Sequence, residues 1–320
     1  MVTQATGPIF ILGVTPRSGT NFLMDLLCLH SACAPGRHPV KEDFFLEYSD
    51  LLLDYTNSVR AGWDPMWGRF TPALMADFRR ALGFGLTSFL WVDRDRRLVT
   101  KTPSVKNLDL FFTFFPDAKL LILIRDGRSV VQSCMDTFGW EFDRATRVWR
   151  DGARTIARFQ RVAGMEGRYR LLRYEDLLDD LRPTLRDTLR FLELDYGAFD
   201  FEAAERLPVR GSSAFFGPER RRVHWDPVRK DSSFNPRERW WNWGAATLER
   251  FNWIAGDQLE QFGYGSAPGR WRIRKSIKHN SLDLKWGAKV ASRRGAYRIR
   301  GILGDVSRPV RAKLGWTHDS

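Results

Sequence analysis

A turn-like segment near the start of the sequence gathers glycine, hydroxyl and guanidinium groups in the pattern of an anion site. The apolar run 8–14 (PIFILGV) is followed by TPRSGTN at 15–21, and then by apolar residues at helical spacing. A loop between a strand and a helix directs backbone N–H groups at one spot, where the helix dipole adds positive charge. Gly19 allows close backbone approach, and Ser18 and Thr20 can donate hydroxyl hydrogen bonds. The segment predicts a phosphate-binding loop, with a plain strand-to-helix turn as the alternative.

This loop differs from the lysine-bearing loop of nucleotide triphosphatases, GxxxxGK[ST]. Its glycine spacing is one residue longer, no lysine follows Gly19, and its basic residue, Arg17, comes before that glycine. The difference disfavours a magnesium-nucleotide phosphotransferase, which stays an alternative.

Polar residues also follow two other strand-like runs. Residues 97–100 lead into Lys101-Thr102-Pro103, and the near-continuous apolar run 118–124 ends at Arg125. Arg125 can face a phosphate from its strand end, whereas spacing alone leaves open whether the following helix brings Ser133 to the same ligand. A rival interpretation makes Asp126 a metal-binding acid, and a third leaves Arg128 and Ser133 as ordinary helix-surface residues.

The elements that must position these groups alternate between strand and helix. A fourth strand is predicted at 169–174, and the helical pattern after it contains Pro183, which should bend or split the helix. The alternation indicates an α/β fold with a parallel sheet covered by helices on both faces, in which ligands bind at the carboxyl ends of the strands. The segment 208–243 is loop-like, and such long irregular stretches are usually functional or disordered.

The three segments TPRSGTNFL, KTP and RDGRSVVQS, in this order and each at a predicted strand end, resemble the signature elements of sulfotransferases that use 3′-phosphoadenosine-5′-phosphosulfate (PAPS). The resemblance covers roughly residues 8–264. It is closest to the branch with RSGT loops, which includes the tyrosylprotein sulfotransferases and many bacterial enzymes. It implies a central parallel sheet flanked by helices in the P-loop-NTPase-like sulfotransferase fold, with PAPS as sulfuryl donor.

The resemblance also implies roles for particular residues. The loop residues that would hold the 5′-phosphosulfate are Arg17, Ser18, Gly19, Thr20 and Asn21. The 3′-phosphate would be bound by Arg125 and Ser133. Further cofactor contacts would come from Tyr174, from Ser212 or Ser213 near the transferring group, and from Arg239. Thr137 stands where the family has another arginine.

The catalytic groups that the resemblance implies suit an in-line sulfuryl transfer through a loose transition state. Arg17 and Lys101 would stabilise charge growing on the leaving phosphate, with Ser212 nearby, and Glu42 would accept the proton of the acceptor hydroxyl. His38 and Asp43 are rival bases, and Glu42 could instead neutralise a neighbouring lysine. The transferred group carries less charge than a phosphoryl group, so no metal is expected.

Charge divides the chain into two predicted regions, a sulfotransferase domain over 1–268 and a basic tail over 269–320. Of the net charge of +13, the tail carries +11, from 14 Lys/Arg against 3 Asp/Glu, which leaves +2 on the other 268 residues. A nearly neutral body disfavours nucleic acid as a partner. Basic residues interleaved with Trp, Ile and Leu favour an anionic membrane surface, with a polyanion or a solvated extension as alternatives.

The sequence thus predicts a PAPS-dependent sulfotransferase acting on a hydroxyl acceptor, such as a carbohydrate, a lipid-linked sugar or a small metabolite. With three cysteines, no long apolar stretch and no signal-like start, a cytoplasmic protein is expected, peripheral to a membrane if the tail binds one. A different class of function, a catalytically silent membrane- or polyanion-binding protein, stays open. Peptide tyrosine is a less favoured acceptor, because a chain without a signal sequence would not meet secretory proteins.

Overall fold

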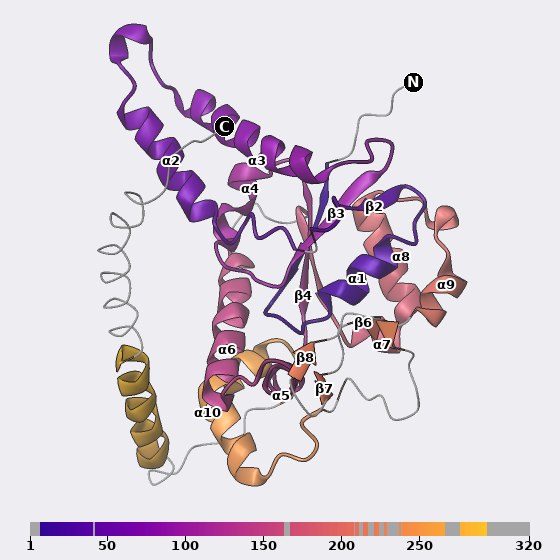
Figure 1. Cartoon of the computed structure of the whole chain (residues 1–320), viewed down its shortest axis with the longest axis vertical. Coiled ribbons are helices and arrows are strands. Elements are labelled where there is room, and N and C mark those ends of the chain that lie inside the picture. The colour runs from indigo at the N-terminus through magenta and orange to yellow at the C-terminus, as the bar shows by residue number, and fades with distance from the viewer. Residues whose placement is uncertain are drawn as a thin grey trace, which may run out of the picture. The chain divides into compact units, whose positions relative to one another are not determined.

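The computed structural model places a five-stranded parallel sheet at the centre of the protein (Figure 1). The structure describes residues 7–40, 42–162, 167–207, 237, 239–265 and 276–292, together with the backbone of four two- or three-residue strands between 209 and 228. By contacts the chain divides into two units, 1–266 and 267–320. In the second unit residues 276–292 are helical.

The sheet has the order β2-β3-β1-β4-β5, and every neighbouring pair is parallel. The predicted central parallel sheet is therefore confirmed. Its strands are β1 (Ile9–Gly13), β2 (Cys33–Pro35), β3 (Arg97–Thr102), β4 (Lys119–Ile124) and β5 (Tyr169–Arg173). The chain leaves β1 toward one side of the sheet and β4 lies on the other. In folds of this class, ligands bind where two such loops diverge.

Alternating side chains of the central strands supply two hydrophobic cores, one on each face of the sheet. Phe10, Leu12 and Ile122 point to one core, whereas Ile9 and Ile11 point to the other. The first core is completed by α4 (Phe111–Phe114), α5 (Gly127–Phe138), α6 (Phe142–Phe159) and α10 (Ala245–Gln261). The second is completed by α1 (Thr20–Leu27), α7 (Asp176–Asp179), α8 (Leu181–Leu192) and α9 (Phe201–Arg206).

The helical pattern that contains Pro183 is split, as predicted, but the break falls at Asp180 between α7 and α8. Pro183 lies in the first turn of α8, where its missing N–H has no intrahelical partner to lose.

Between β2 and β3 the chain forms a helical hairpin that projects from the first unit (Figure 1). It consists of α2 (Ser49–Ala61), a 3₁₀ turn at Pro65–Trp67 and α3 (Pro72–Leu90). The hydroxyl of Thr71 accepts a hydrogen bond from the N–H of Leu74 at 3.2 Å, and Pro72 occupies the first position of α3. A capping hydroxyl followed by proline is a common helix start, so the sequence itself sets where α3 begins.

The remaining elements are short. Two further 3₁₀ turns lie at Leu108–Leu110 and Tyr196–Ala198. The loop-like segment 208–243 contains β6 (Val209–Arg210), β7 (Ala214–Phe216), β8 (Arg221–Val223) and β9 (Pro227–Val228), paired as β6–β9 and β7–β8. Among the described residues, none of the helices is long and apolar enough to span a membrane.

Candidate functional site

The loop between β1 and α1 is folded back on itself by local hydrogen bonds. The Ser18 hydroxyl donates to the Thr15 carbonyl at 2.6 Å and accepts from the Thr15 N–H at 3.2 Å. Arg17 and Gly19 have positive φ angles of 73° and 98°. Gly19 is the residue before α1, and no side chain caps that helix. The first N–H groups of α1 are therefore available to an anion, as the sequence predicts.

Tyr174 holds this loop and the end of β4 together. Its ring lies against Gly19 so closely that a Cβ atom on that glycine would be 2.3 Å from Cδ2 of the tyrosine. The same ring also contacts Arg125, whose guanidinium carbon lies 4.5 Å from the ring centroid. Tyr174 is buried, and its N–H donates to the Ile124 carbonyl at 2.8 Å. The tyrosine thus fixes the distance between the loop and the strand-end arginine.

Arg17 belongs to the loop expected at the 5′-phosphosulfate, and it also contacts Arg125 and Ser133, the residues expected at the 3′-phosphate. Its Nε atom donates to the Ser133 hydroxyl at 3.0 Å, and its carbonyl accepts from Nη1 of Arg125 at 2.8 Å. Ser133 is buried on α5. The spacing of Arg125 and Ser133 left their proximity open, and the structure brings both to Arg17.

Positive charge is concentrated at this point. Burial, followed by the charges of Arg239 and Arg125, lowers the pKa of Arg17 to about 10. Burial and then Arg125 also lower the pKa of Arg239. Arg125 and Arg239 thus disfavour the charge of Arg17, and a multiply charged anion bound among the three guanidinium groups would relieve this repulsion. The residues present therefore fit a phosphate-bearing ligand.

The segment between β2 and α2 brings a carboxylate to the end of β3. Nζ of Lys101 lies 3.0 Å from Oε1 of Glu42, and the lysine is almost completely buried while the glutamate keeps part of its surface in solvent. Lys101 pairs with Ile11, two residues before the end of β1, because β3 is the parallel neighbour of β1. A cation and a partly exposed carboxylate at this place can stabilise a leaving group and accept a proton.

The two rival bases are placed differently. The Asp43 carboxylate accepts hydrogen bonds from the hydroxyls of Thr100 at 2.6 Å and Thr102 at 2.9 Å, and from the N–H of Phe45 at 3.0 Å. Burial raises its pKa. These bonds tie the segment before α2 to β3, which positions the adjacent Glu42. His38 is exposed.

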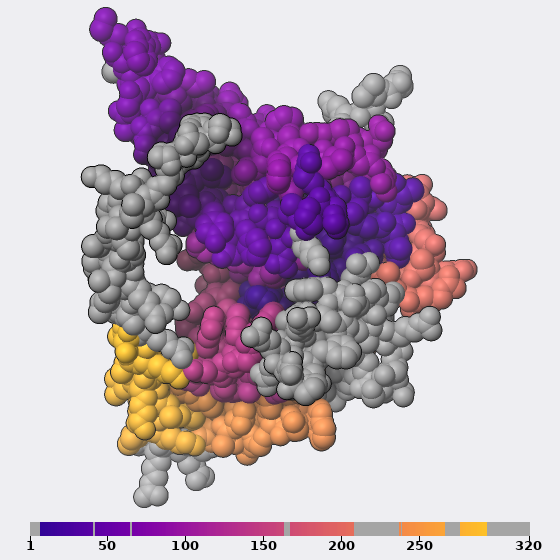
Figure 2. Space-filling view, in the orientation of Figure 1, coloured from indigo at the N-terminus to yellow at the C-terminus, as the bar shows by residue number. Residues whose placement is uncertain are grey.

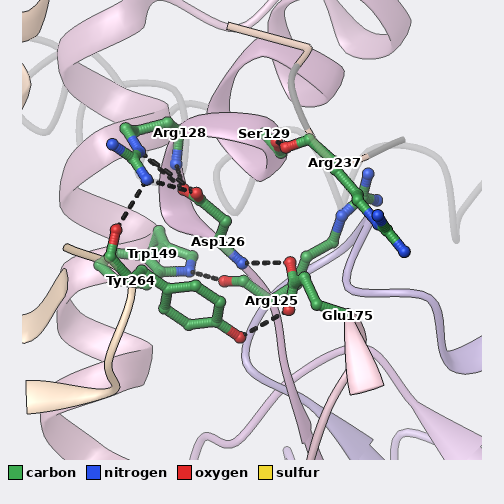
Figure 3. Close-up of polar contacts among 8 residues, drawn as sticks. All are labelled: Arg125, Asp126, Arg128, Ser129, Trp149, Glu175, Arg237 and Tyr264. Carbon is green, nitrogen blue, oxygen red and sulfur yellow. Dashed lines mark hydrogen bonds and ion pairs between the residues drawn. The ribbon is translucent and has the colours of Figure 1, made fainter. Parts of the chain in front are cut away.

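A hydrogen-bond network that the sequence does not reveal holds the backbone at Arg125 and Asp126 (Figure 3). The Arg125 carbonyl accepts from the indole N–H of Trp149 at 3.1 Å. The next N–H, that of Asp126, donates to Oε1 of Glu175 at 3.0 Å, and Oε2 of Glu175 accepts from the Tyr264 hydroxyl at 2.8 Å. The end of β4 is thus bound to α6 and to the segment between β5 and α7, which in turn is bound to the chain after α10.

Asp126 and Arg128 have structural partners. The Asp126 carboxylate caps α5 by accepting from the N–H of Arg128 at 2.8 Å, and both of its oxygens accept from the Arg128 guanidinium. That guanidinium also donates to the Tyr264 carbonyl at 2.8 Å and lies 3.9 Å from the Trp240 ring centroid. Asp126 therefore offers little to a metal ion. Over the described ranges there is no group of three His, Cys, Asp or Glu side chains that could hold one.

The chain before α10 approaches the same region. The Ser129 hydroxyl donates to the Arg237 carbonyl (Figure 3). Arg239 is near enough to Arg125 for their charges to interact. Ser212 and Ser213 lie outside the described residues. Thr137, where the family has an arginine, is buried on α5.

Comparison with known proteins identifies the class. The family model described as "Sulfotransferase family" matches residues 8–198, which is more than half of the chain. The chain therefore belongs to the sulfotransferase family, and this confirms the family predicted from the strand-end motifs. None of the curated proteins matches the sequence.

Several solved structures are similar to the chain. A sulfotransferase from Alicyclobacillus acidocaldarius is 16% identical, with 82% of this chain and 97% of that chain covered and a TM-score of 0.45. A sulfotransferase domain from the curacin biosynthetic pathway is 24% identical over 61% of this chain and 76% of that chain, with a TM-score of 0.40. Retinol dehydratase, solved with retinol and PAP, is 15% identical over 84% of each chain, with a TM-score of 0.36. All three scores are below 0.5, so family membership rests on the sequence match.

Proposed function

We propose that this sulfotransferase moves a sulfuryl group from PAPS to a hydroxyl acceptor. The observation that carries the proposal is the contact of Arg17 with both Ser133 and Arg125, which links the loop expected at the 5′-phosphosulfate to the residues expected at the 3′-phosphate. A ligand with phosphate groups at both ends of a ribose matches such a linked pair of anion sites. A nucleoside with a 5′-phosphate chain alone would leave one of them empty.

In this proposal each residue of the candidate site has a role in binding PAPS. The N–H groups at the start of α1, with Ser18 to Asn21, would hold the 5′-phosphosulfate, and Arg125 and Ser133 the 3′-phosphate. Tyr174 orients Arg125 through its ring, and Arg239 adds a third positive charge. Ser212 and Ser213 keep their predicted roles near the transferring group.

In the proposed reaction PAPS supplies the sulfuryl group on a phosphate leaving group. The oxygen of the acceptor hydroxyl forms a bond to sulfur as the bond between sulfur and the phosphate oxygen breaks. Glu42 accepts the hydroxyl proton, while Lys101 and Arg17 stabilise the charge that appears on adenosine 3′,5′-bisphosphate. The Glu42–Lys101 contact supports this assignment, because the carboxylate and the ammonium group lie 3.0 Å apart.

We propose a carbohydrate, a lipid-linked sugar or another small hydroxyl compound as acceptor, and a cytoplasmic location. The basic region 269–320 would bring the protein to an anionic membrane surface, since it holds 14 Lys/Arg and 3 Asp/Glu. The magnesium-nucleotide phosphotransferase is the weaker alternative, because Gly19 is not followed by a lysine and both oxygens of Asp126 are bound to Arg128.

The experiment is an acceptor screen that follows release of adenosine 3′,5′-bisphosphate from PAPS by chromatography, without magnesium. Acceptor pools would contain sugars, small alcohols and phenols, or tyrosine peptides, with Lys101→Ala as the matched inactive control. Acceptor-dependent release by the wild type but not by Lys101→Ala supports the proposal. No release with any pool, together with turnover of magnesium-ATP, contradicts it, and release with tyrosine peptides alone contradicts the acceptor class.

A further inference from the structure

The turn of the α2–α3 hairpin lies at the far end of a projection (Figures 1 and 2). It exposes large apolar side chains there. We call residues 63–70 the hairpin tip. Within it Met66 is 90% exposed and Trp67 72% exposed, and they are adjacent in the chain. Single exposed apolar residues are ordinary on protein surfaces, but two neighbours at the end of a projection are the form of an interaction site.

Aromatic packing holds the hairpin tip in a defined conformation. The Trp63 ring packs edge-on against Trp67, with centroids 6.0 Å apart, and against Phe70 at 5.1 Å. Phe70 in turn contacts Phe78 of α3 at 6.4 Å. Arg79 then ties α3 to α2, because its guanidinium donates to Thr56 at 3.1 Å and to Asn57 at 3.0 Å. A packed base of this kind holds the Trp67 ring in place, which lowers the conformational entropy lost on binding.

Three N–H groups of the hairpin tip donate hydrogen bonds within the tip. The N–H groups of Met66 and Trp67 donate to the carboxylate and the carbonyl of Asp64, both at 2.9 Å. The indole N–H of Trp63 donates to the Gly68 carbonyl at 3.1 Å. Backbone and indole groups that are already bonded can leave water at a low cost, which is the condition for entering an apolar medium.

The charged residues at the hairpin tip favour a lipid surface over a second copy of the chain as its partner. Arg60, just before the hairpin tip, and Arg69, within it, are exposed, and the Asp64 carboxylate between them accepts a hydrogen bond from the Met66 N–H. A second copy of the chain on the same tip would bring these arginines toward their own counterparts. Tryptophan and methionine between arginines instead match the boundary between lipid phosphates and acyl chains.

We infer that the hairpin tip inserts Met66 and Trp67 into the interface of an anionic phospholipid bilayer, with Arg60 and Arg69 on the lipid phosphates. The inference rests on the hairpin and not on the proposed sulfuryl transfer. A single shallow insertion binds weakly, so a second signal is needed for stable attachment. The basic region 269–320, with its balance of +11, would supply that second signal.

The test begins with co-sedimentation of the full chain with phosphatidylcholine vesicles, with and without phosphatidylserine. The variant Met66→Ser/Trp67→Ser should bind the anionic vesicles at least about tenfold more weakly than the wild type, since even partial burial of two such side chains exceeds the free energy of a tenfold change. The matched control is Phe84→Ser, which removes an aromatic side chain that is 66% exposed elsewhere on α3. This control should bind like the wild type.

A label reports on the hairpin tip itself, independently of the tail. Burial raises the pKa of Cys28 to about 12, of Cys33 to about 11 and of Cys134 to about 12, so the native thiols should react slowly. An environment-sensitive fluorophore can then be placed on Met66→Cys, with Phe84→Cys as control. A blue shift of the Met66→Cys label on adding anionic vesicles, absent from the control, supports insertion.

Three results would overturn the inference. The first is vesicle binding with the Met66→Cys label still in water, because the tail alone then makes the contact. The second is no binding to anionic vesicles by the wild type. The third is a concentration-dependent increase in molar mass by light scattering that Met66→Ser/Trp67→Ser abolishes, which would make the hairpin tip a dimer contact. Unchanged thermal unfolding of each variant shows that the comparison is between folded proteins.

Discussion

Nζ of Lys101 and Oε1 of Glu42 lie 3.0 Å apart, although 59 residues separate them in the chain. The contact puts a buried cation and a partly exposed carboxylate at the carboxyl end of β3, next to the loop that follows β1. In the proposed reaction, proton removal and leaving-group stabilisation are therefore performed by neighbouring side chains.

The first prediction concerns Glu42 as the base. Glu42→Gln keeps the shape of the side chain and its contact with Lys101 but cannot accept a proton, so kcat should fall by about 10²- to 10⁴-fold. Affinity for adenosine 3′,5′-bisphosphate should stay unchanged. The measurement is acceptor-dependent release of the bisphosphate, with His38→Gln as the matched control. A large loss of kcat in His38→Gln and none in Glu42→Gln would assign the base to the histidine.

The second prediction concerns Asp43 and pH. Burial raises its pKa in the folded state, so its protonated form stabilises the fold. That contribution is complete below the unfolded-state pKa and is lost as pH rises through the folded-state pKa. The stability advantage of the wild type over Asp43→Asn should be largest in acid and shrink as pH rises, as urea unfolding at several pH values would show. An advantage that grows with pH would mean that the Thr100 and Thr102 hydrogen bonds outweigh burial.

The third prediction separates backbone strain from steric exclusion at the loop. Gly19 and Gly68 both have a positive φ, 98° and 110°, so alanine strains each backbone by about 1 kcal/mol. A Cβ at Gly19 would collide with the Tyr174 ring at 2.3 Å, whereas one at Gly68 would have nothing within 4 Å. Gly19→Ala should therefore abolish bisphosphate binding and unfold at a lower temperature than Gly68→Ala. Equal melting temperatures and equal affinities would show that the Gly19–Tyr174 contact is unimportant.

The fourth prediction concerns the electrostatic repulsion of Arg17 by Arg125 and Arg239. Because burial and two neighbouring arginines lower the pKa of Arg17 to about 10, its charge is disfavoured in the folded protein without ligand. In buffer free of multivalent anions, Arg17→Gln should be at least as stable as the wild type. Bisphosphate at about a hundred times its Kd should stabilise the wild type by about 2.7 kcal/mol and the variant far less. Thermal unfolding measures both effects, and equal stabilisation of the two proteins would remove Arg17 from the site.

Much of the fold could be predicted because local sequence carries it. The apolar runs at 8–14 and 118–124 became β1 and β4 with only their end residues trimmed. β2 was missed because it has three residues, too few to show any periodicity. The α2–α3 hairpin was missed as well, although Thr71-Pro72 marks the start of α3.

The residues of the candidate site that lie at strand ends could be predicted from the sequence, whereas the contacts between distant segments could not. Gly19, Lys101 and Arg125 follow apolar runs, so their place at one edge of a parallel sheet follows from the fold class. The contact of Arg17 with Ser133 joins residues 116 apart, and that of Glu175 with Tyr264 joins residues 89 apart. Such pairs depend on how helices pack on the sheet, and no single segment encodes that packing.

The central claim is that Arg125 and Ser133 recognise a 3′-phosphate in a site joined to the β1 loop. Calorimetric titration without magnesium tests it most directly, with adenosine 3′,5′-bisphosphate and adenosine 5′-monophosphate as the two ligands. Arg125→Gln is the variant, because glutamine removes the positive charge while keeping a polar side chain at the end of β4.

Loss of a charged hydrogen bond to phosphate should weaken bisphosphate binding by at least about tenfold and leave monophosphate binding unchanged. An equal loss for both ligands would mean that Arg125 only supports the loop. No bisphosphate binding by the wild type, with binding of magnesium-ATP instead, would contradict PAPS as the donor.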